Sequence, residues 1–255
     1  MRKEVHVQIA KELFKKLNLP KNYEKVFIRA VVEPDRWRRR HPRYKHHYLQ
    51  YYTILDYVKR AREAYINGYI QACLQNLGIA LHFIQDAFIP SPRTRELRKS
   101  HQHLEGKVAS FKGETLFMLR NAIDEGFMVS VSSPKFIENV LSNIQWIYDE
   151  DEVLKCATKT SAMITAAVFG PKDPPSGLRE KYRMLKEEHD KRISKASIIS
   201  LISAIIGLTL TILLENIYLL PIFFFIIPIL IYAGILSDDE EFYEVKEEAS
   251  WYGIK

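Results

Sequence analysis

The sequence predicts an all-α protein, a multi-helix bundle followed by a two-helix transmembrane hairpin. Two observations predict this fold class. Through residues 1 to about 195, apolar side chains recur at spacings of three and four, and no segment alternates convincingly as a strand would. Residues 196–236 then contain one charged group, Glu215, within two apolar runs. The 255 residues leave room for one large domain or two small ones.

Amphipathic periodicity and proline positions predict the individual helices. Residues 6–17 place lysines opposite an apolar face, and residues 48–66 repeat apolar side chains about one turn apart. Residues 68–88 are apolar around almost the whole circumference, which is typical of a central helix packed on every side. Further helices are expected at about 97–123, 134–148, 149–168 and 176–195, separated by Pro90, Pro92, Pro134 and the segment 170–177.

The two apolar runs, 197–214 and 217–236, indicate a membrane anchor. Either run, as a helix, spans roughly 27–30 Å, which is close to the thickness of a bilayer core. Only residues 215 and 216 separate them, so we expect a tight hairpin. Its two prolines, Pro221 and Pro228, are tolerated in membrane helices. The alternative is a buried hairpin of a soluble protein, but the preceding domain has no obvious surface to cover it.

Charge and cysteine content place the preceding domain on the cytoplasmic side. Four basic residues come just before the hairpin: Lys186, Lys191, Arg192 and Lys195. The positive-inside rule then predicts that both ends of the chain are cytoplasmic. The first twenty residues are charged and amphipathic, so we expect no secretory signal peptide. The two cysteines, Cys73 and Cys156, suggest no disulfide framework.

We therefore expect four parts along the chain. They are a helical metal-binding domain at 1–170, a connecting helix at 171–195, the transmembrane hairpin at 196–236 and an acidic cytoplasmic tail at 237–255. The tail is most simply a solvated end, because seven acidic residues and one lysine lie between positions 237 and 248. The metal-binding assignment of the first domain rests on its polar residues.

Histidines and carboxylates at helical spacing point to a metal site. His82 and Asp86 lie four residues apart on the apolar helix 68–88, so both project from the same stripe. His101 and Glu105 repeat this spacing at the start of a later helix. Taken singly, each pair can be a satisfied core pair, a cap or a surface group. Together they favour zinc, which prefers these ligands and offsets the cost of burying carboxylates in an apolar bundle.

The order of these motifs resembles that of the zinc-dependent phospholipase C family, which is related to the fungal single-strand-specific zinc nucleases. The shared elements are LGIALHFIQDAFIPSP followed by HQHLE, an upstream PD and HHY, and an N-terminal HVQIA. The resemblance covers roughly residues 1–170. It implies a helical core that holds a cluster of up to three zinc ions, which cleave phosphodiesters of lipids or nucleic acids.

The resemblance implies a first zinc site. Its ligands would be Asp35, one of two adjacent histidines, His82 and Asp86. The two histidines are His46 and His47, which point about 100° apart on a helix, so we expect one of them to be a ligand. The sequence does not choose between them. The resemblance also names Asp35 as the general base.

Two further ions follow from the same resemblance. Asp86 would bridge to a second ion, bound also by His6 and, in the family, by the free amino terminus. His101 and Glu105 would help to hold a third ion. The family usually has a histidine six residues after the aspartate of its H-x-x-x-D motif. Pro92 stands there in this chain, so the third site would lack one ligand.

A basic segment lies between two of the presumed ligands. Its six positive residues are Arg36, Arg38, Arg39, Arg40, Arg43 and Lys45. A solvated surface loop is the simplest alternative. Beside a membrane anchor these charges would attract anionic headgroups, at about 1 kcal/mol for each charge near the surface. Beside a metal cluster they would gather phosphate-bearing substrates or nucleic acid. The membrane anchor favours lipid.

The sequence therefore predicts a membrane-tethered, zinc-dependent phosphodiester hydrolase of the phospholipase C type. Two alternatives stay open. One is a zinc-dependent nuclease or nucleotide phosphohydrolase that uses the same cluster. The other is a catalytically degenerate, membrane-anchored scaffold with one metal or none. The expected partners are the membrane and a phosphodiester substrate, and the residues indicate no particular protein partner.

Overall fold

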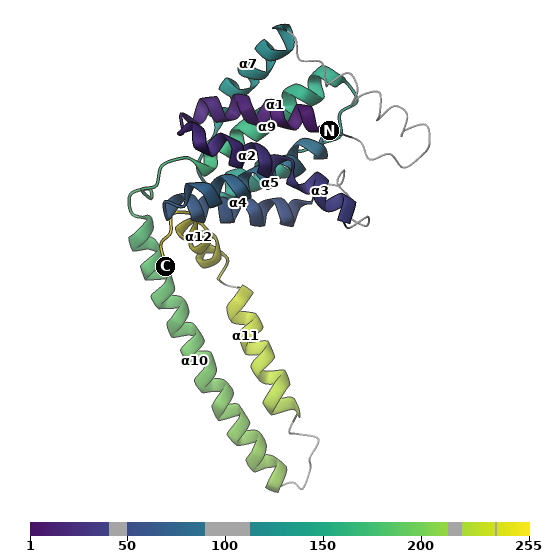
Figure 1. Cartoon of the computed structure of the whole chain (residues 1–255). Helices are drawn as coiled ribbons and strands as arrows, with labels where there is room; N and C mark the ends of the chain where they lie inside the picture. The colour runs from purple at the N-terminus through teal and green to yellow at the C-terminus, as the bar shows by residue number, and fades with distance from the viewer. Residues whose placement is uncertain (41–49, 90–112, 214–220, 238) are drawn as a thin grey trace. The chain divides into compact units, whose positions relative to one another are not determined.

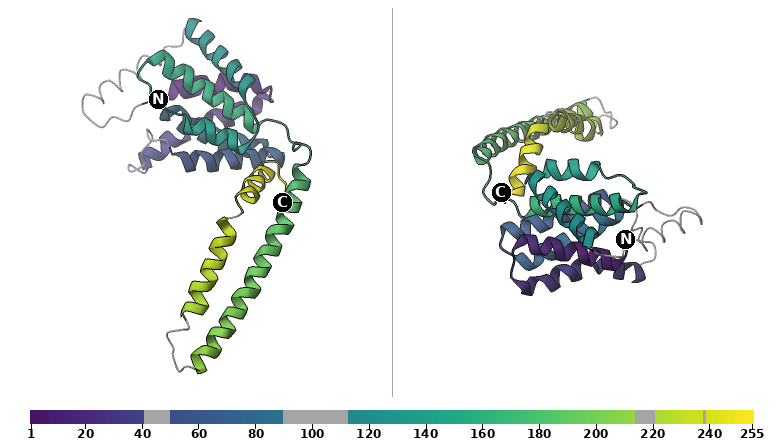
Figure 2. Two further views of the ribbon diagram at one scale, coloured as in Figure 1. Left: turned by 180° about the vertical axis from the view of Figure 1, so that it is seen from behind. Right: turned by 90° about the horizontal axis from the view of Figure 1, so that it is seen from above.

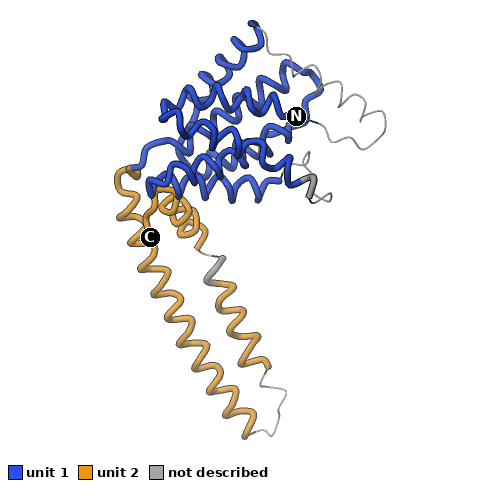
Figure 3. Tube along the Cα trace, viewed as in Figure 1, with its two compact units in different colours: residues 1–172 blue, residues 173–255 orange. Residues whose placement is uncertain are grey.

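The structure, a computed structural model, describes residues 1–40, 50–89, 113–213, 221–237 and 239–255, without the side chains of 38–40 and 235–237. These residues are mostly helical and contain no strand, which confirms the all-α class. The chain folds as two compact units, unit 1 at Met1–Lys172 and unit 2 at Asp173–Lys255 (Figure 3).

Unit 1 is a helix bundle. Its described elements are α1 (Lys3–Leu17), a 3-10 turn η1 (Lys21–Tyr23), α2 (Glu24–Val31), α3 (Glu33–Arg40), α4 (Tyr51–Ile66), α5 (Ile70–Ala87), α7 (Gly113–Val129), α8 (Pro134–Ser142) and α9 (Glu150–Val168) (Figure 1).

Helix α5 is the central helix of unit 1, as the apolar circumference of residues 68–88 predicted. It packs against α2, α4 and α9, and every residue from Ala80 to Ala87 is buried. Gly78 lets α2 approach closely, because a Cβ at this position would lie 2.7 Å from the Cβ of Ala30. This close approach brings the C-terminal end of α2 beside the last turns of α5.

Helices α1, α7 and α9 complete the bundle. Seen from behind in Figure 2, α7 lies along α9, and Gly126 of α7 approaches Ala162 of α9 closely. Helix α1 contacts α2 and α7. The buried carboxylate of Glu12 joins α1 to α7, because it accepts a hydrogen bond of 3.1 Å from Nε of Arg120.

Two predicted helix boundaries in unit 1 are wrong. The helix expected over 134–148 ends at Ser142, where the side-chain amide of Asn143 donates to the carbonyl of Asn139. A new helix begins at Glu150, because the Asp149 carboxylate accepts from the backbone N–H of Glu152 and caps it. The other helix, expected over 97–123, extends to Val129, and its first part lies outside the described residues.

Unit 2 consists of α10 (Leu178–Leu213), a π-helical turn η3 (Ile222–Ile226), α11 (Ile227–Ser237) and α12 (Glu240–Trp251) in its described residues. The helix expected over 176–195 does not end at 195. It continues as the 36-residue α10, whose second half is apolar. Within the described ranges, α10 is the one helix long and apolar enough to cross a membrane, and Ile222–Gly234 is a shorter apolar helix.

The acidic tail is not merely a solvated end, because it contains helix α12 packed on α10. Its apolar side chains Phe242 and Val245 are buried three residues apart on one face. The ring of Phe242 stacks on His189 of α10, with centroids 4.1 Å apart. Asp239, just before α12, binds Nδ1 of His189 at 2.6 Å and accepts from Arg192 at 3.2 Å. The sequence did not predict this pairing, because the short apolar stripe of α12 lies among many carboxylates.

A buried arginine fastens the end of unit 1. The guanidinium of Arg62, on α4, donates to the carbonyls of Val168 at 2.9 Å, Gly170 at 3.0 Å and Pro171. Arg62 is 1% exposed. These carbonyls come at and after the end of α9, where helix geometry provides no backbone donor, and a cation is favourable there.

We expect the Arg62→Met variant to lower the free energy of unfolding by about 3 kcal/mol or more. The methionine keeps much of the apolar stem but leaves buried carbonyl groups without their charged donor. Arg60→Met is the matched control on the same helix, since Arg60 is exposed and pairs with Asp56 one turn away. Thermal unfolding of the full chain in detergent measures both, and equal melting temperatures would contradict the role of Arg62.

Candidate metal centre

Four polar residues from three helices meet at one end of unit 1. His6 lies on the first turns of α1, Asp35 in the first turn of α3, and His82 and Asp86 on the last turns of α5. Figure 1 shows the start of α1 and helix α3 on the same side of this unit. The amphipathic pattern of α1 turns the face that carries Val5 and His6 inward, and both are buried.

The ligand atoms of these residues converge. One atom from each of His6, Asp35 and His82 lies within 4.8 Å of the other two. Asp86 lies close to both imidazoles, with Oδ1 3.3 Å from Nε2 of His6 and Oδ2 3.5 Å from Nε2 of His82. The structure thus brings together four residues that the sequence analysis proposed as metal ligands.

Three side chains of the cluster are buried, and the fourth, Asp35, is partly exposed. The side chains of His6 and His82 are fully buried, and that of Asp86 is 3% exposed. The side chain of Asp35 is 37% exposed. Asp35 is therefore the solvent-facing member of the cluster, and the other three groups are buried.

A backbone carbonyl sets the orientation of His82. Its Nδ1 lies 2.9 Å from the carbonyl oxygen of Val31. A carbonyl only accepts, so Nδ1 carries the proton, and in the neutral ring Nε2 presents a lone pair to the cluster. The carbonyl is in reach because Gly78 allows α2 to approach α5, so the packing of two helices decides the tautomer.

A buried glutamine plays the same part for His6. The Nδ1 of His6 lies 2.6 Å from Oε1 of Gln85, and the amide of Gln85 donates to Oγ of Ser161 on α9 at 3.1 Å. With Oε1 as acceptor, His6 carries its proton on Nδ1 and turns Nε2 toward Asp86 and His82. The rings of His6 and His82 lie 4.4 Å apart at 30°. Both imidazoles are therefore held by hydrogen bonds on the side away from the cluster.

Asp86 is a carboxylate at neutral pH. Burial by itself raises the pKa of its carboxyl, but the neighbouring amino group of Met1, His82 and His6 together outweigh burial. They hold the pKa well below the usual range for aspartate. The amino group of Met1 donates directly to Oδ1. A charged carboxylate is therefore available beside both imidazoles throughout the physiological pH range.

The cluster has the chemistry of a metal site. Two imidazole nitrogens and carboxylate oxygens suit a divalent transition metal. Nε2 of His6 is buried and has no hydrogen-bond partner among the described residues. A buried nitrogen of this kind costs free energy unless it is satisfied, and coordination of a cation would satisfy it. His6, Asp35 and His82 could therefore hold a metal ion.

The remaining predicted residues are not part of this described cluster. Arg36 is exposed and pairs with Glu33 at 3.3 Å. Seven other residues named in the sequence analysis lie outside the part of the chain that the structure describes: His46, His47, Pro92, His101, Glu105, Arg43 and Lys45. The backbone of Arg38, Arg39 and Arg40 continues helix α3, but their side chains are outside the described part as well.

Sequence reasoning missed the groups that orient the imidazoles. Gln85 had a usable signal, because it is a polar residue next to Asp86 on a helix expected to be buried on every side. The Val31 carbonyl and Ser161 had none. A backbone acceptor is identical at every position, and Ser161 becomes relevant only because α9 packs against α5.

Comparison with known proteins does not assign a family to this geometry. No protein-family model matches the chain, and no curated protein or solved structure matches it significantly. The resemblance to zinc-dependent phospholipases C thus rests on the motifs in the sequence.

Gln85→Met should weaken binding of Zn²⁺ or Co²⁺ by about 10- to 100-fold, as is typical when a group that orients a metal ligand is lost. The methionine fills a similar volume but offers no strong acceptor to Nδ1 of His6. Gln85→Glu restores an acceptor and is expected to recover tight binding. Competition with a chromogenic chelator measures both affinities.

Gln75→Met is the control for this series, because Gln75 is on the same helix but exposed. Its metal affinity should equal that of the unaltered chain. Unchanged affinity in Gln85→Met, with a folded helical spectrum, would show that Gln85 does not orient a ligand.

Proposed function

We propose that this chain is a membrane-tethered, metal-dependent phosphodiester hydrolase of the phospholipase C type. The observation that carries the proposal is the convergence of His6, Asp35 and His82 within 4.8 Å, at a place open to solvent through Asp35. Asp86 adds a charged carboxylate beside both imidazoles. The motif resemblance supplies the reaction class.

Zinc is the proposed metal, with two or three ions in the complete site. His6, Asp35, His82 and Asp86 would hold it, with Asp86 as the bridging ligand. A bound zinc ion supplies a Lewis acid for phosphate oxygens and acidifies a coordinated water to near neutrality. The third site would need His101 and Glu105, which lie outside the described residues.

The side chains of this chain would perform complementary tasks. The bundle holds His6 and His82 rigidly through Gln85 and the Val31 carbonyl, so little reorganisation is needed when ligands bind. Asp35 is the proposed general base, because its carboxylate is the solvent-facing one and can accept a proton from the attacking water. Asp35 lies in the first turn of helix α3, and α3 continues into the basic segment. The positive charges of that segment would attract the phosphate of the substrate.

The membrane part of the proposal is a two-span hairpin with both ends cytoplasmic. Helix α10 supports one span by length and composition. Two contacts within unit 2 support a packed second span. Oγ of Ser197 lies 2.7 Å from the hydroxyl of Tyr232, and Gly207 lies so close to Phe223 that a side chain at position 207 would clash. Small residues at such a crossing are typical of membrane helix pairs.

Asp86→Ala should remove both bound zinc and hydrolysis, because it deletes the carboxylate that lies beside both imidazoles. Elemental analysis of the purified full chain gives the zinc content, and Asp86→Asn, which is nearly isosteric, guards against loss of folding. Asp124→Ala, at an exposed carboxylate on α7, is the control and should retain both. Full zinc occupancy with unchanged turnover in Asp86→Ala would refute the assignment.

The same preparation separates the three candidate activities. Phospholipid vesicles, single-stranded DNA and nucleotides are offered side by side, and release of a phosphorylated headgroup from the vesicles is expected. Preferred cleavage of DNA or nucleotides would instead identify a nuclease or a nucleotide phosphohydrolase. No hydrolysis, with one zinc or none, would identify a membrane-anchored scaffold.

Accessibility of single cysteines to a membrane-impermeant maleimide tests the hairpin. In a chain with Cys73 and Cys156 changed to serine, Lys186→Cys and Lys255→Cys should react from the same side of sealed vesicles. Glu215→Cys should react only from the other side. Reaction of Lys186→Cys and Lys255→Cys from opposite sides would mean a single span.

A further inference from the structure

The loop between α8 and α9, residues 143–149, has a fixed backbone next to the metal cluster. The backbone N–H of Ile147 donates to the carbonyl of Phe88 at 2.9 Å, and Phe88 is two residues after Asp86. The far end of the loop is fixed as well, because Asp149 caps α9. The loop therefore lies against the end of α5 that carries the cluster.

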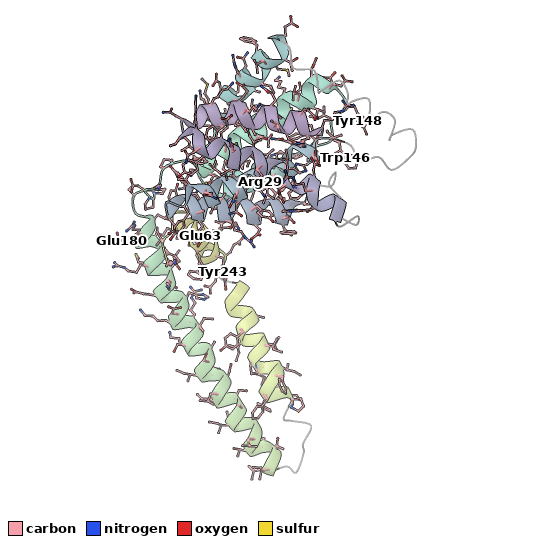
Figure 4. All side chains as sticks on the ribbon, viewed as in Figure 1. Arg29, Glu63, Trp146, Tyr148, Glu180 and Tyr243 are labelled. Atoms are coloured by element: carbon pink, nitrogen blue, oxygen red, sulfur yellow. The ribbon has the colours of Figure 1, made fainter. Side chains whose placement is uncertain are left out.

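Two aromatic side chains project from this loop. Trp146 is 42% exposed and Tyr148 is 68% exposed, while Ile147 between them is less exposed. In Figure 4 both Trp146 and Tyr148 lie at one edge of unit 1. Large aromatic rings in water cost free energy, so a pair of them on an anchored loop points to a partner surface.

We propose that residues 146–148 dock unit 1 onto the lipid bilayer, at the boundary between headgroups and acyl chains. Tryptophan and tyrosine are the side chains that prefer this boundary, because one end of each is apolar and the other is polar. Unit 1 would lie near a membrane, because α10 of the same chain has the length and composition of a membrane span. Helix α3, which carries Asp35 of the cluster, is basic after this residue and complements anionic headgroups.

This docking surface deepens the proposed function, on which it rests for the choice of lipid as substrate. Docking at this loop would bring the bilayer surface, with its lipid phosphates, close to the cluster. The exposed aliphatic side chains at the C-terminal end of α7 do not lie beside the loop 143–149. Met128 and Val129 are exposed, but the following residue Ser130 bonds to the carbonyl of Met163, toward the C-terminal end of α9.

Tryptophan quenching tests contact with lipid directly. The full chain has three tryptophans, and Trp37→Phe with Trp251→Phe leaves Trp146 as the reporter. In phosphatidylcholine–phosphatidylserine vesicles, lipids spin-labelled near the top of the acyl chain should quench its emission strongly, and aqueous iodide should quench it weakly. Strong iodide quenching with no lipid quenching would overturn the proposal.

A reporter at the other end of unit 1 is the matched control. Met128→Trp, in a chain whose native tryptophans are all phenylalanine, should respond to iodide and not to the spin-labelled lipid. Equal lipid quenching of both reporters would mean that contact is not specific to the loop and would overturn the proposal. Protection of Trp146 by oligothymidine but not by vesicles would instead identify a platform for single-stranded nucleic acid.

Kinetics give a second, independent test. Trp146→Ser combined with Tyr148→Ser should raise KM for vesicle substrate by about tenfold or more, through loss of buried aromatic area. Turnover of a soluble short-chain phospholipid should stay unchanged. Equal effects on both substrates would contradict a docking role.

The two proposals fail separately. Lipid quenching of Trp146 does not depend on turnover, so it can be measured in the Asp86→Asn chain. Quenching without hydrolysis in the unaltered chain would leave docking intact and refute the enzyme, whereas hydrolysis without quenching would refute docking alone.

Discussion

A charged carboxylate at the buried end of the central helix is the constraint on which the site depends. Ionised Asp86 in an apolar bundle would cost several kcal/mol unless positive or hydrogen-bonding groups surround it. The structure supplies the Met1 amino group and two imidazoles. Helices α1 and α5 must therefore meet at this end, because each contributes one imidazole. A metal ion held by the same residues would balance the charge still more completely.

The geometry of the cluster depends on the groups that hydrogen-bond to its two imidazoles from outside. The carbonyl of Val31 and the amide of Gln85 hold the rings of His82 and His6 from behind. Both depend on close helix packing, at Gly78 for the first and at the contact between α5 and α9 for the second. The helix contacts that pack the core therefore also orient the two imidazoles. A larger residue at position 78 would push α2 away and release an imidazole.

Helix α10 of unit 2 joins a charged first half to an apolar second half. The first half of α10 is charged and pairs with α12 through Asp239, His189 and Phe242. Its second half meets the π-helical turn η3, where Gly207 approaches Phe223 closely. The polar pairing and the close contact both join α10 to the segment that follows it in the chain.

The sequence by itself determined the all-α class, the central position of helix 68–88, the apolar segment and the pair His82 and Asp86. These features follow from periodicity and composition, which local residues carry. It did not predict that helix 134–148 ends at Ser142, or that the acidic tail forms a packed helix. A single cap decides the first feature, and a short apolar stripe decides the second. Only the tertiary structure decided which way the imidazoles face, and that the loop 143–149 lies against the end of α5. Those facts depend on contacts between residues far apart in the chain, and no local pattern encodes such contacts.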